Sequence, residues 1–226
     1  MKSFLLSILY FIITALYILS AYSIIDAPPL LFKSLIIPVL IIIFILNIRL
    51  QQSRFNMFML LALAFSWAGD VLLQIDTGGT DLFLPGLTAF LLAHIMYIVI
   101  FFGTPGNNGF LEKHFYLTFA LLLYGVALTG LLWDYLGKLR IPVIFYGIVI
   151  LTMIAGALNR YYKSERRSYW LVLTGAILFV LSDSLLAVNK FAFPFSFAGL
   201  AVMSTYALAQ FLIVTGYLLQ TARSFR

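Results

Sequence analysis

The amino-acid sequence predicts an all-α fold, that of a polytopic membrane protein with eight transmembrane helices. The first observation is composition, because 63% of the residues are hydrophobic, 10% are charged and the mean hydropathy is +1.07. Ordinary soluble domains are only about 45–50% apolar, so much of this chain must face lipid. The second and third observations are the length of the apolar runs and the short, turn-rich segments that join them.

Apolar runs of about 20 residues are long enough to cross the roughly 30 Å hydrocarbon core of a bilayer as helices. The sequence contains eight such runs, at residues 4–24, 30–48, 55–75, 82–103, 115–133, 141–159, 169–188 and 196–220. Their connections carry turn residues, as in segments 26–29 (DAPP) and 76–79 (DTGG). Lys2 and the first run resemble a signal peptide, but that run is long enough to cross and seven more follow. We therefore expect one integral membrane domain over residues 1–226.

Lysine and arginine residues are distributed unevenly between the predicted loops. Ten lie on one side of the membrane: Lys2, Arg49, Arg54, Lys113, Arg160, Lys163, Arg166, Arg167, Arg223 and Arg226. Three lie on the other, Lys138, Arg140 and Lys190, and Lys33 falls inside the second run. Because cytoplasmic loops are enriched in Lys and Arg, we expect a cell-membrane protein with both termini in the cytoplasm. The net charge of +6 is confined to short clusters, which argues against a nucleic-acid partner.

Two acidic residues, Asp70 and Asp183, fall inside predicted helices. Each lies about 15 residues beyond the cytoplasmic end of its helix, so at about 1.5 Å per residue both reach a similar depth in the outer half of the bilayer. An aspartate in hydrocarbon costs at least about 2.5–3.5 kcal/mol, and intramembrane acids are functional by default. The structural alternative is a protonated Asp that bonds across helices to Ser66, Ser182 or Ser184.

The spacing of the two aspartates, 113 residues in a chain of 226, predicts a tandem repeat of four helices plus four. The halves would be about 1–113 and 114–226, and the same offset places Lys33 on Tyr146. An even number of helices per half means that both halves insert in the same direction, as in some transporters.

Other polar side chains are predicted at depths in the bilayer that would let them reach Asp70 or Asp183. Lys33 begins the second helix, where it either snorkels to the interface or keeps one aspartate ionised. His94 and Tyr97 share a helix face at i and i+3, and so do Tyr206 and Gln210 at i and i+4. His94 is equally compatible with a helix-to-helix hydrogen bond and with a site.

The sequence predicts no metal and no cofactor. The chain has no cysteine, and His114 is expected at the far cytoplasmic end of its helix, which leaves His94 alone and argues against zinc. Walker, dinucleotide, nucleophile-elbow and zinc-helix motifs are absent from the sequence.

Two further polar residues lie close to Asp183 in the sequence. Ser182 directly precedes Asp183, and Asn189 follows at the predicted outer boundary of the membrane. Helix capping explains Asn189 as readily as substrate binding does.

Three segments carry a resemblance to a known family: 65–73 (FSWAGDVLL), 86–97 (GLTAFLLAHIMY) and 175–187 (GAILFVLSDSLLA). They are similar to the signature segments of the YhhN family, the lysoplasmalogenases. This resemblance extends nearly end to end and includes the eight-helix count and the lysine early in the second helix. It implies a membrane hydrolase that splits the vinyl ether bond of lysoplasmalogen, a single-chain phospholipid, into a fatty aldehyde and a glycerophospho-base.

By the same resemblance, Asp70 and Asp183 occupy the signature acidic positions of that family, and His94 and Tyr97 its fourth-helix motif. The chemistry suits two carboxyl groups, because acid protonates the vinyl ether carbon and a carboxylate stabilises the resulting cation, as in glycoside cleavage. We expect the two aspartates to divide these roles, and we expect Lys33 and His94 to adjust the protonation of the aspartates.

Two alternatives remain open. A small-molecule or lipid transporter would use the same acids in a central pathway, but Pro38 and Pro142 are expected near helix starts and no run is broken in its middle. A structural or sensory bundle would use the acids as interhelical hydrogen bonders.

Overall fold

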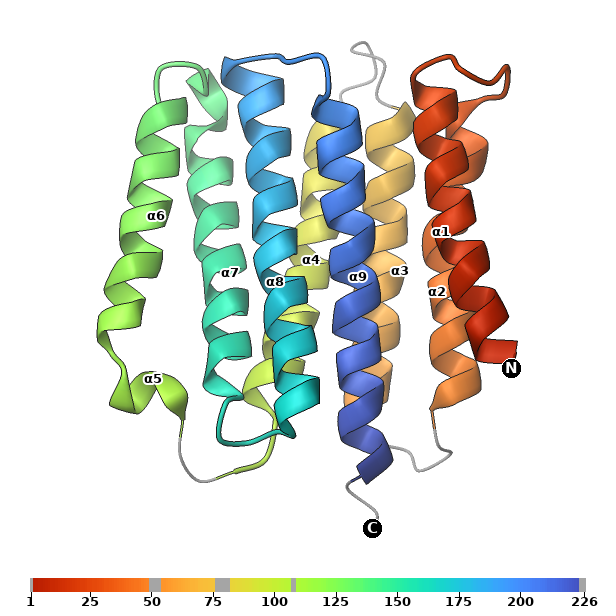
Figure 1. Ribbon diagram of the computed structural model, residues 1–226. Helices are drawn as coiled ribbons and strands as arrows, with labels where there is room; N and C mark the ends of the chain where they lie inside the picture. The colour runs from red at the N-terminus through yellow and green to blue at the C-terminus, as the bar shows by residue number, and fades with distance from the viewer. Residues whose placement is uncertain (1, 49–53, 76–81, 107–108, 224–226) are drawn as a thin grey trace. The chain divides into compact units, whose positions relative to one another are not determined.

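Within the part of the chain that the structure describes, every regular element is helical and none is a strand. The structure is a computed structural model that describes residues 2–48, 54–75, 82–106 and 109–223. The α-helices are α1 (Lys2–Ala21), α2 (Pro29–Asn47), α3 (Arg54–Ile75), α4 (Phe83–Phe102), α5 (Phe110–Lys113), α6 (Tyr116–Leu132), α7 (Arg140–Asn159), α8 (Arg166–Ala187) and α9 (Ala198–Arg223). A 3₁₀ turn, η1 (Gly137–Leu139), precedes α7, and a π-helical turn, η2 (Val188–Ala192), continues α8 (Figure 1).

The all-α membrane fold is confirmed, because seven of the described helices are long and apolar enough to cross a bilayer. They are α1 to α4 and α7 to α9. Helix α6 is apolar but has 17 residues, at the lower limit of about 17–25 for a transmembrane helix. The count of eight spans and the tandem repeat therefore stay predictions.

Two details of the helices differ from the sequence predictions. The first apolar run was expected to be helical to residue 24, but α1 ends at Ala21, because Ser23 adopts a φ of 55° that no α-helix allows. Pro38 lies in the middle of α2, not near its start, although α2 continues through it. Pro142 is the third residue of α7, as expected.

Some sequence features fall outside the described residues and stay predictions. These are the turn at 76–79, Arg49 and Arg226, together with the side chains of Lys2, Arg54 and Arg223. The predicted cytoplasmic location of both termini depends on several of them.

The chain forms two compact units. The first unit comprises Met1–Tyr97 and Thr221–Arg226, and the second comprises Ile98–Gln220. The boundary falls within α4, so the first unit holds α1, α2, α3 and most of α4. The second unit holds the end of α4, α5 to α8, and α9 as far as Gln220.

In the first unit, α1 packs on α2 and α2 packs on α3, as the red and orange helices of Figure 1 show. Close approach of α3 to α4 depends on Gly69, because a Cβ there would lie 2.6 Å from the Phe90 ring. A larger residue at this position would force the Phe90 ring or one of the two helices to shift. Gly69 directly precedes Asp70, so this contact fixes the stretch of α3 that carries the first acid.

In the second unit, α6 packs on α7 and α7 on α8. The contact between α8 and α9 depends on Gly175 and Gly216. A Cβ on Gly175 would lie 2.9 Å from the Ala209 carbonyl, and one on Gly216 would lie 2.7 Å from Val172. These two glycines let the helices meet closely around residues 171–175 of α8, the helix that carries the second acid.

Candidate active site

Asp70 is buried in α3, with 3% of its surface exposed. Its carboxyl group lies within electrostatic range of the Tyr10 and Tyr17 hydroxyls on α1 and of the Lys33 ammonium on α2. Tyr97 on α4, which is fully buried, interacts in turn with Tyr10. Helices α1 and α2 therefore contribute polar groups around Asp70, and α4 contributes Tyr97 beside one of them, Tyr10.

Lys33 points into this group of residues. Its Nζ lies 5.6 Å from the centroid of the Tyr17 ring, a cation–π contact. The Tyr17 hydroxyl donates a hydrogen bond of 3.2 Å to Gln74 Oε1, one turn beyond Asp70 on α3. These contacts hold the ammonium among α1, α2 and α3. They favour the interpretation that Lys33 compensates the charge of Asp70, rather than the alternative that Lys33 snorkels to the interface.

His94 is fully buried in α4, and its Nδ1 lies 2.7 Å from the Phe90 carbonyl oxygen of the preceding turn. A carbonyl can only accept a hydrogen bond, so Nδ1 carries the proton and Nε2 is the acceptor nitrogen of the neutral ring. This bond gives His94 a structural contact within its own helix. Its predicted influence on an aspartate stays a prediction.

Asp183 is half-buried in α8, and its Oδ2 accepts a hydrogen bond from the Tyr146 hydroxyl of α7. The neighbouring Ser184 Oγ lies 2.6 Å from the Tyr124 hydroxyl of α6 and donates to the Val180 carbonyl. Since the serine proton goes to Val180, Tyr124 is the donor to Ser184. Two tyrosines from two helices therefore bond to adjacent residues of α8.

The remaining predicted residues of the second unit make contacts typical of packing and turns. Ser182 donates to the Val202 carbonyl of α9 at 3.0 Å, and Asn189 Oδ1 accepts from the Phe195 N–H at 3.1 Å. Tyr206 and Gln210 are buried in α9, with Gln210 Nε2 3.4 Å from the Tyr206 hydroxyl. The Asn189 bond closes the turn between η2 and α9. Helix capping and substrate binding by Asn189 both stay predictions.

The predicted site residues thus form two polar centres, one in each unit. The Asp70 centre contains Lys33, Tyr97 and two tyrosines, Tyr10 and Tyr17, that sequence reasoning missed. The Asp183 centre contains Tyr146 and, on the adjacent serine, Tyr124, which was also missed. The chain has 13 tyrosines, and the repeat offset singled out Tyr146 alone among these.

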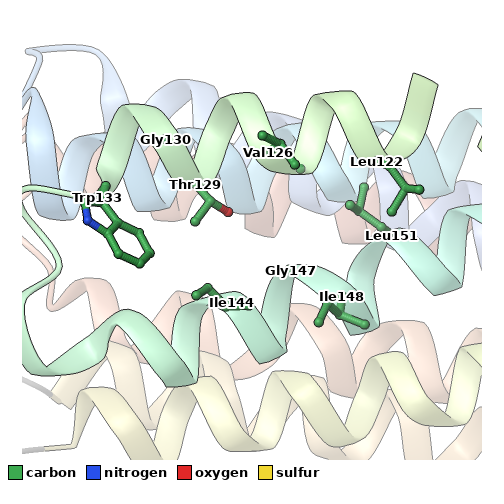
Figure 2. Close-up of a pocket in the computed structure, with 10 residues that line it drawn as sticks. Leu122, Val126, Thr129, Gly130, Trp133, Ile144, Gly147, Ile148 and Leu151 are labelled. Atoms are coloured by element: carbon green, nitrogen blue, oxygen red, sulfur yellow. The ribbon is translucent and has the colours of Figure 1, made fainter. Parts of the chain in front are cut away.

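An apolar groove of about 400 Å³ runs between α6 and α7 (Figure 2). Leu122 and Val126 line it from α6, Trp133 from the residue after α6, and Ile144 and Ile148 from α7. None of the predicted site residues is among its lining residues. Among the described residues, no three His, Asp or Glu side chains gather as metal ligands would.

Comparisons with known proteins agree with the sequence resemblance. A model of the YhhN family matches residues 29–217. Human lysoplasmalogenase TMEM86B is 34% identical over 131 residues, 58% of this chain and 52% of that protein. Pig lysoplasmalogenase TMEM86B is 38% identical over 133 residues, 59% of this chain and 53% of that protein.

A bacterial relative extends the matched region. The lysoplasmalogenase of Mycobacterium tuberculosis is 30% identical over 158 residues, 69% of this chain and 58% of that protein. The matches thus cover little more than half the length of these curated relatives. No solved structure matches. Since the family model matches most of the chain, this protein belongs to the YhhN family.

Proposed function

We propose that this protein is a membrane lysoplasmalogenase, which hydrolyses the vinyl ether bond of a lysoplasmalogen to a fatty aldehyde and a glycerophospho-base. Family membership and the names of the relatives support the activity. The observation that carries the chemistry is Asp70, a carboxyl group buried inside a membrane-spanning helix beside a lysine and two tyrosines.

The reaction requires a proton donor and a carboxylate. The donor protonates the alkenyl carbon β to the ether oxygen, which leaves a cation shared by the α carbon and that oxygen. Water attacks the α carbon and loses its proton to the carboxylate, giving a hemiacetal. The hemiacetal then collapses to the aldehyde and the glycerol hydroxyl. Glycosidases divide acid and base roles between two carboxyl groups in the same way.

The two polar centres suggest which aspartate takes which role. The Lys33 ammonium supplies a positive charge to Asp70, so Asp70 is the ionised carboxylate that stabilises the cation and accepts the proton of water. Tyr146 is a neutral donor to Asp183 and brings no counter-charge. A protonated Asp183 accepts the tyrosine hydrogen bond at one oxygen and donates its own proton from the other.

Phosphate recognition is proposed for cations at the same end of the second unit as Asp183. Arg140 is held there by Trp133, with its guanidinium carbon 4.6 Å from the indole centroid and its Nε donating to the Trp133 carbonyl at 3.2 Å. Lys138 precedes it in η1, and Lys190 lies in η2 beyond Asp183. A single-chain phospholipid carries its phosphate close to its vinyl ether, which matches this placement.

The product formed in heavy water tests the activity and the mechanism together. Purified full-length protein in detergent should release aldehyde from lysoplasmenylcholine or lysoplasmenylethanolamine. In D₂O the trapped aldehyde should carry one deuterium on the carbon next to the carbonyl group, because the proton on that carbon comes from the enzyme and hence from solvent. Absence of aldehyde, or aldehyde without that deuterium, would contradict the proposal.

A transporter remains the second candidate, since Pro38 in the middle of α2 removes a backbone donor from a spanning helix. In proteoliposomes a transporter would move lysophospholipid between leaflets without consuming it. Lipid movement without aldehyde release would favour this candidate.

A further inference from the structure

Arg160 is the most deeply buried cation of the second unit that the candidate active site does not use. It directly follows α7, and 1% of its surface is exposed. The guanidinium carbon lies 5.6 Å from the centroid of the Phe101 ring at the end of α4. Its position at the C-terminal end of α7 favours a positive charge electrostatically.

The guanidinium group is only partly satisfied by its neighbours. Nη2 donates to Ser168 Oγ on α8 at 3.1 Å and to Gln220 Oε1 on α9. Ser168 Oγ in turn donates to the Gly216 carbonyl at 2.7 Å, so its orientation is fixed. Among the residues that the structure describes, Arg160 Nε and Nη1 are buried without a hydrogen-bond partner.

The charge of Arg160 also lacks compensation by a carboxylate. Burial lowers its pKa to about 10, which still leaves the group charged at neutral pH. Its polar surroundings include the Tyr169 and Tyr217 side chains, and within the described part of the chain no ion pair to a carboxylate is found. A buried cation with unused donors is costly. An anion at this position would both accept those hydrogen bonds and compensate the charge.

The surroundings of Arg160 favour a phosphate group as that anion. Lys163, Arg166 and Arg167 lie within seven residues of it along the chain, against one acid, Glu165. The α7–α8 connection that holds them lies at the same end of the second unit as Gln220 of α9 (Figure 1). The distribution of Lys and Arg predicts that this end faces the cytoplasm, where membranes are anionic.

We propose that Arg160 binds a phosphate group through its Nε and Nη1 hydrogens, at a site formed by the adjacent ends of α7, α8 and α9. The chemical class is a phosphate ester or inorganic phosphate, and the site is distinct from Asp183, which lies near the opposite end of α8. Guanidinium groups are preferred for this task, because they present several donors with a delocalised charge. Bound phosphate would tie three helix ends together.

Thermal unfolding of the full-length protein in detergent tests the site and identifies the source of the phosphate. The additions are phosphatidylglycerol, diacylglycerol with the same chains, and inorganic phosphate against chloride at equal ionic strength. We expect phosphatidylglycerol to raise the unfolding midpoint by about 5 °C and diacylglycerol to leave it unchanged. A rise with inorganic phosphate alone would assign the site to free phosphate. No rise with either phosphate compound would overturn the proposal.

Two variants separate Arg160 from general surface charge. Arg160→Gln should lose the stabilisation by phosphatidylglycerol, and Arg167→Gln, the same change at an exposed arginine of α8, should keep it. Equal stabilisation of both variants would overturn the proposal. If Arg160→Gln does not fold, Gln220→Glu gives the same information. Its carboxylate would pair with Arg160 from within the chain, so phosphatidylglycerol should add less than half of the wild-type shift, and an undiminished shift would contradict the site.

Discussion

The Asp70 and Asp183 centres differ in how the protein compensates a carboxyl group inside a membrane. Asp70 is buried beside a lysine and the hydroxyls of Tyr10 and Tyr17. Asp183 is half-buried and held by the neutral Tyr146 hydroxyl. Both a cation and a hydrogen-bond donor stabilise the charged form of an acid, but a full positive charge does so more strongly than one neutral donor. Residues that look equivalent in the sequence therefore have different surroundings, and the acid and base roles proposed for them rest on that difference.

Loss of the proton donor is expected to have the largest effect. Asp183→Asn keeps the shape and the acceptor for Tyr146 but cannot donate an acidic proton, so kcat for aldehyde release should fall by about 1,000-fold. Asp183→Glu keeps the acid and should retain more activity than the Asn variant. Steady-state kinetics in one detergent would measure both, with far-UV circular dichroism as the control for folding. An Asn variant within tenfold of wild type would remove Asp183 from the chemistry.

Removal of the cation beside Asp70 should have the next largest effect. Lys33→Met leaves Asp70 without its counter-charge, so Asp70 becomes protonated and aldehyde release at pH 7 should fall by about 10- to 100-fold. The rate should recover as pH rises, because Asp70 then ionises again. Lys33→Arg keeps the charge and should follow the wild-type profile of activity against pH more closely. Identical profiles for all three proteins would support simple snorkelling of Lys33.

Variants of the two tyrosines of the Asp183 centre should have smaller effects on kcat, and each serves as the control for the other. Tyr146→Phe removes the hydrogen bond to the aspartate and should lower kcat about tenfold with little change in KM. Tyr124→Phe removes a similar bond to Ser184, one residue away, and should lower kcat less than threefold. Equal losses in the two variants would mean that both tyrosines act by packing rather than by positioning Asp183.

Ser182 should show the smallest effect on activity. Its hydroxyl bonds to the Val202 carbonyl of α9, so Ser182→Ala should cost about 1 kcal/mol of stability. That cost corresponds to about 2–4 °C in the unfolding midpoint for a chain of this size, with kcat unchanged. A tenfold fall in kcat at an unchanged midpoint would instead place Ser182 in the reaction.

The sequence was informative where a residue conflicts with its surroundings. Asp70 and Asp183 stood out because a carboxyl group in an apolar run is costly, and the spans followed from the length needed to cross a bilayer. The end of α1 was missed, since the backbone of Ser23 turns the chain while the apolar residues continue to Ile24. Hydropathy alone does not report that turn.

Contacts between distant helices were harder to predict. Tyr10 and Tyr17 are ordinary members of an apolar, tyrosine-containing helix, and only the packing of α1 on α2 and α3 brings them to Asp70. The sequence predicts Arg160 to be a loop cation, because a position directly after a helix is typical of a solvated residue. The structure buries it between α8 and α9 instead. Burial of this kind depends on tertiary packing and has no local sequence signal.

The central claim is that Asp70 and Asp183 act as base and acid in one reaction. The most direct test compares kcat for aldehyde release among wild type, Asp70→Asn, Asp183→Asn and the double variant. Groups that act as a unit are strongly non-additive, so the double variant should be about as slow as the slower single variant. If the two losses multiply, or if either single variant keeps wild-type turnover, the two aspartates do not share one reaction.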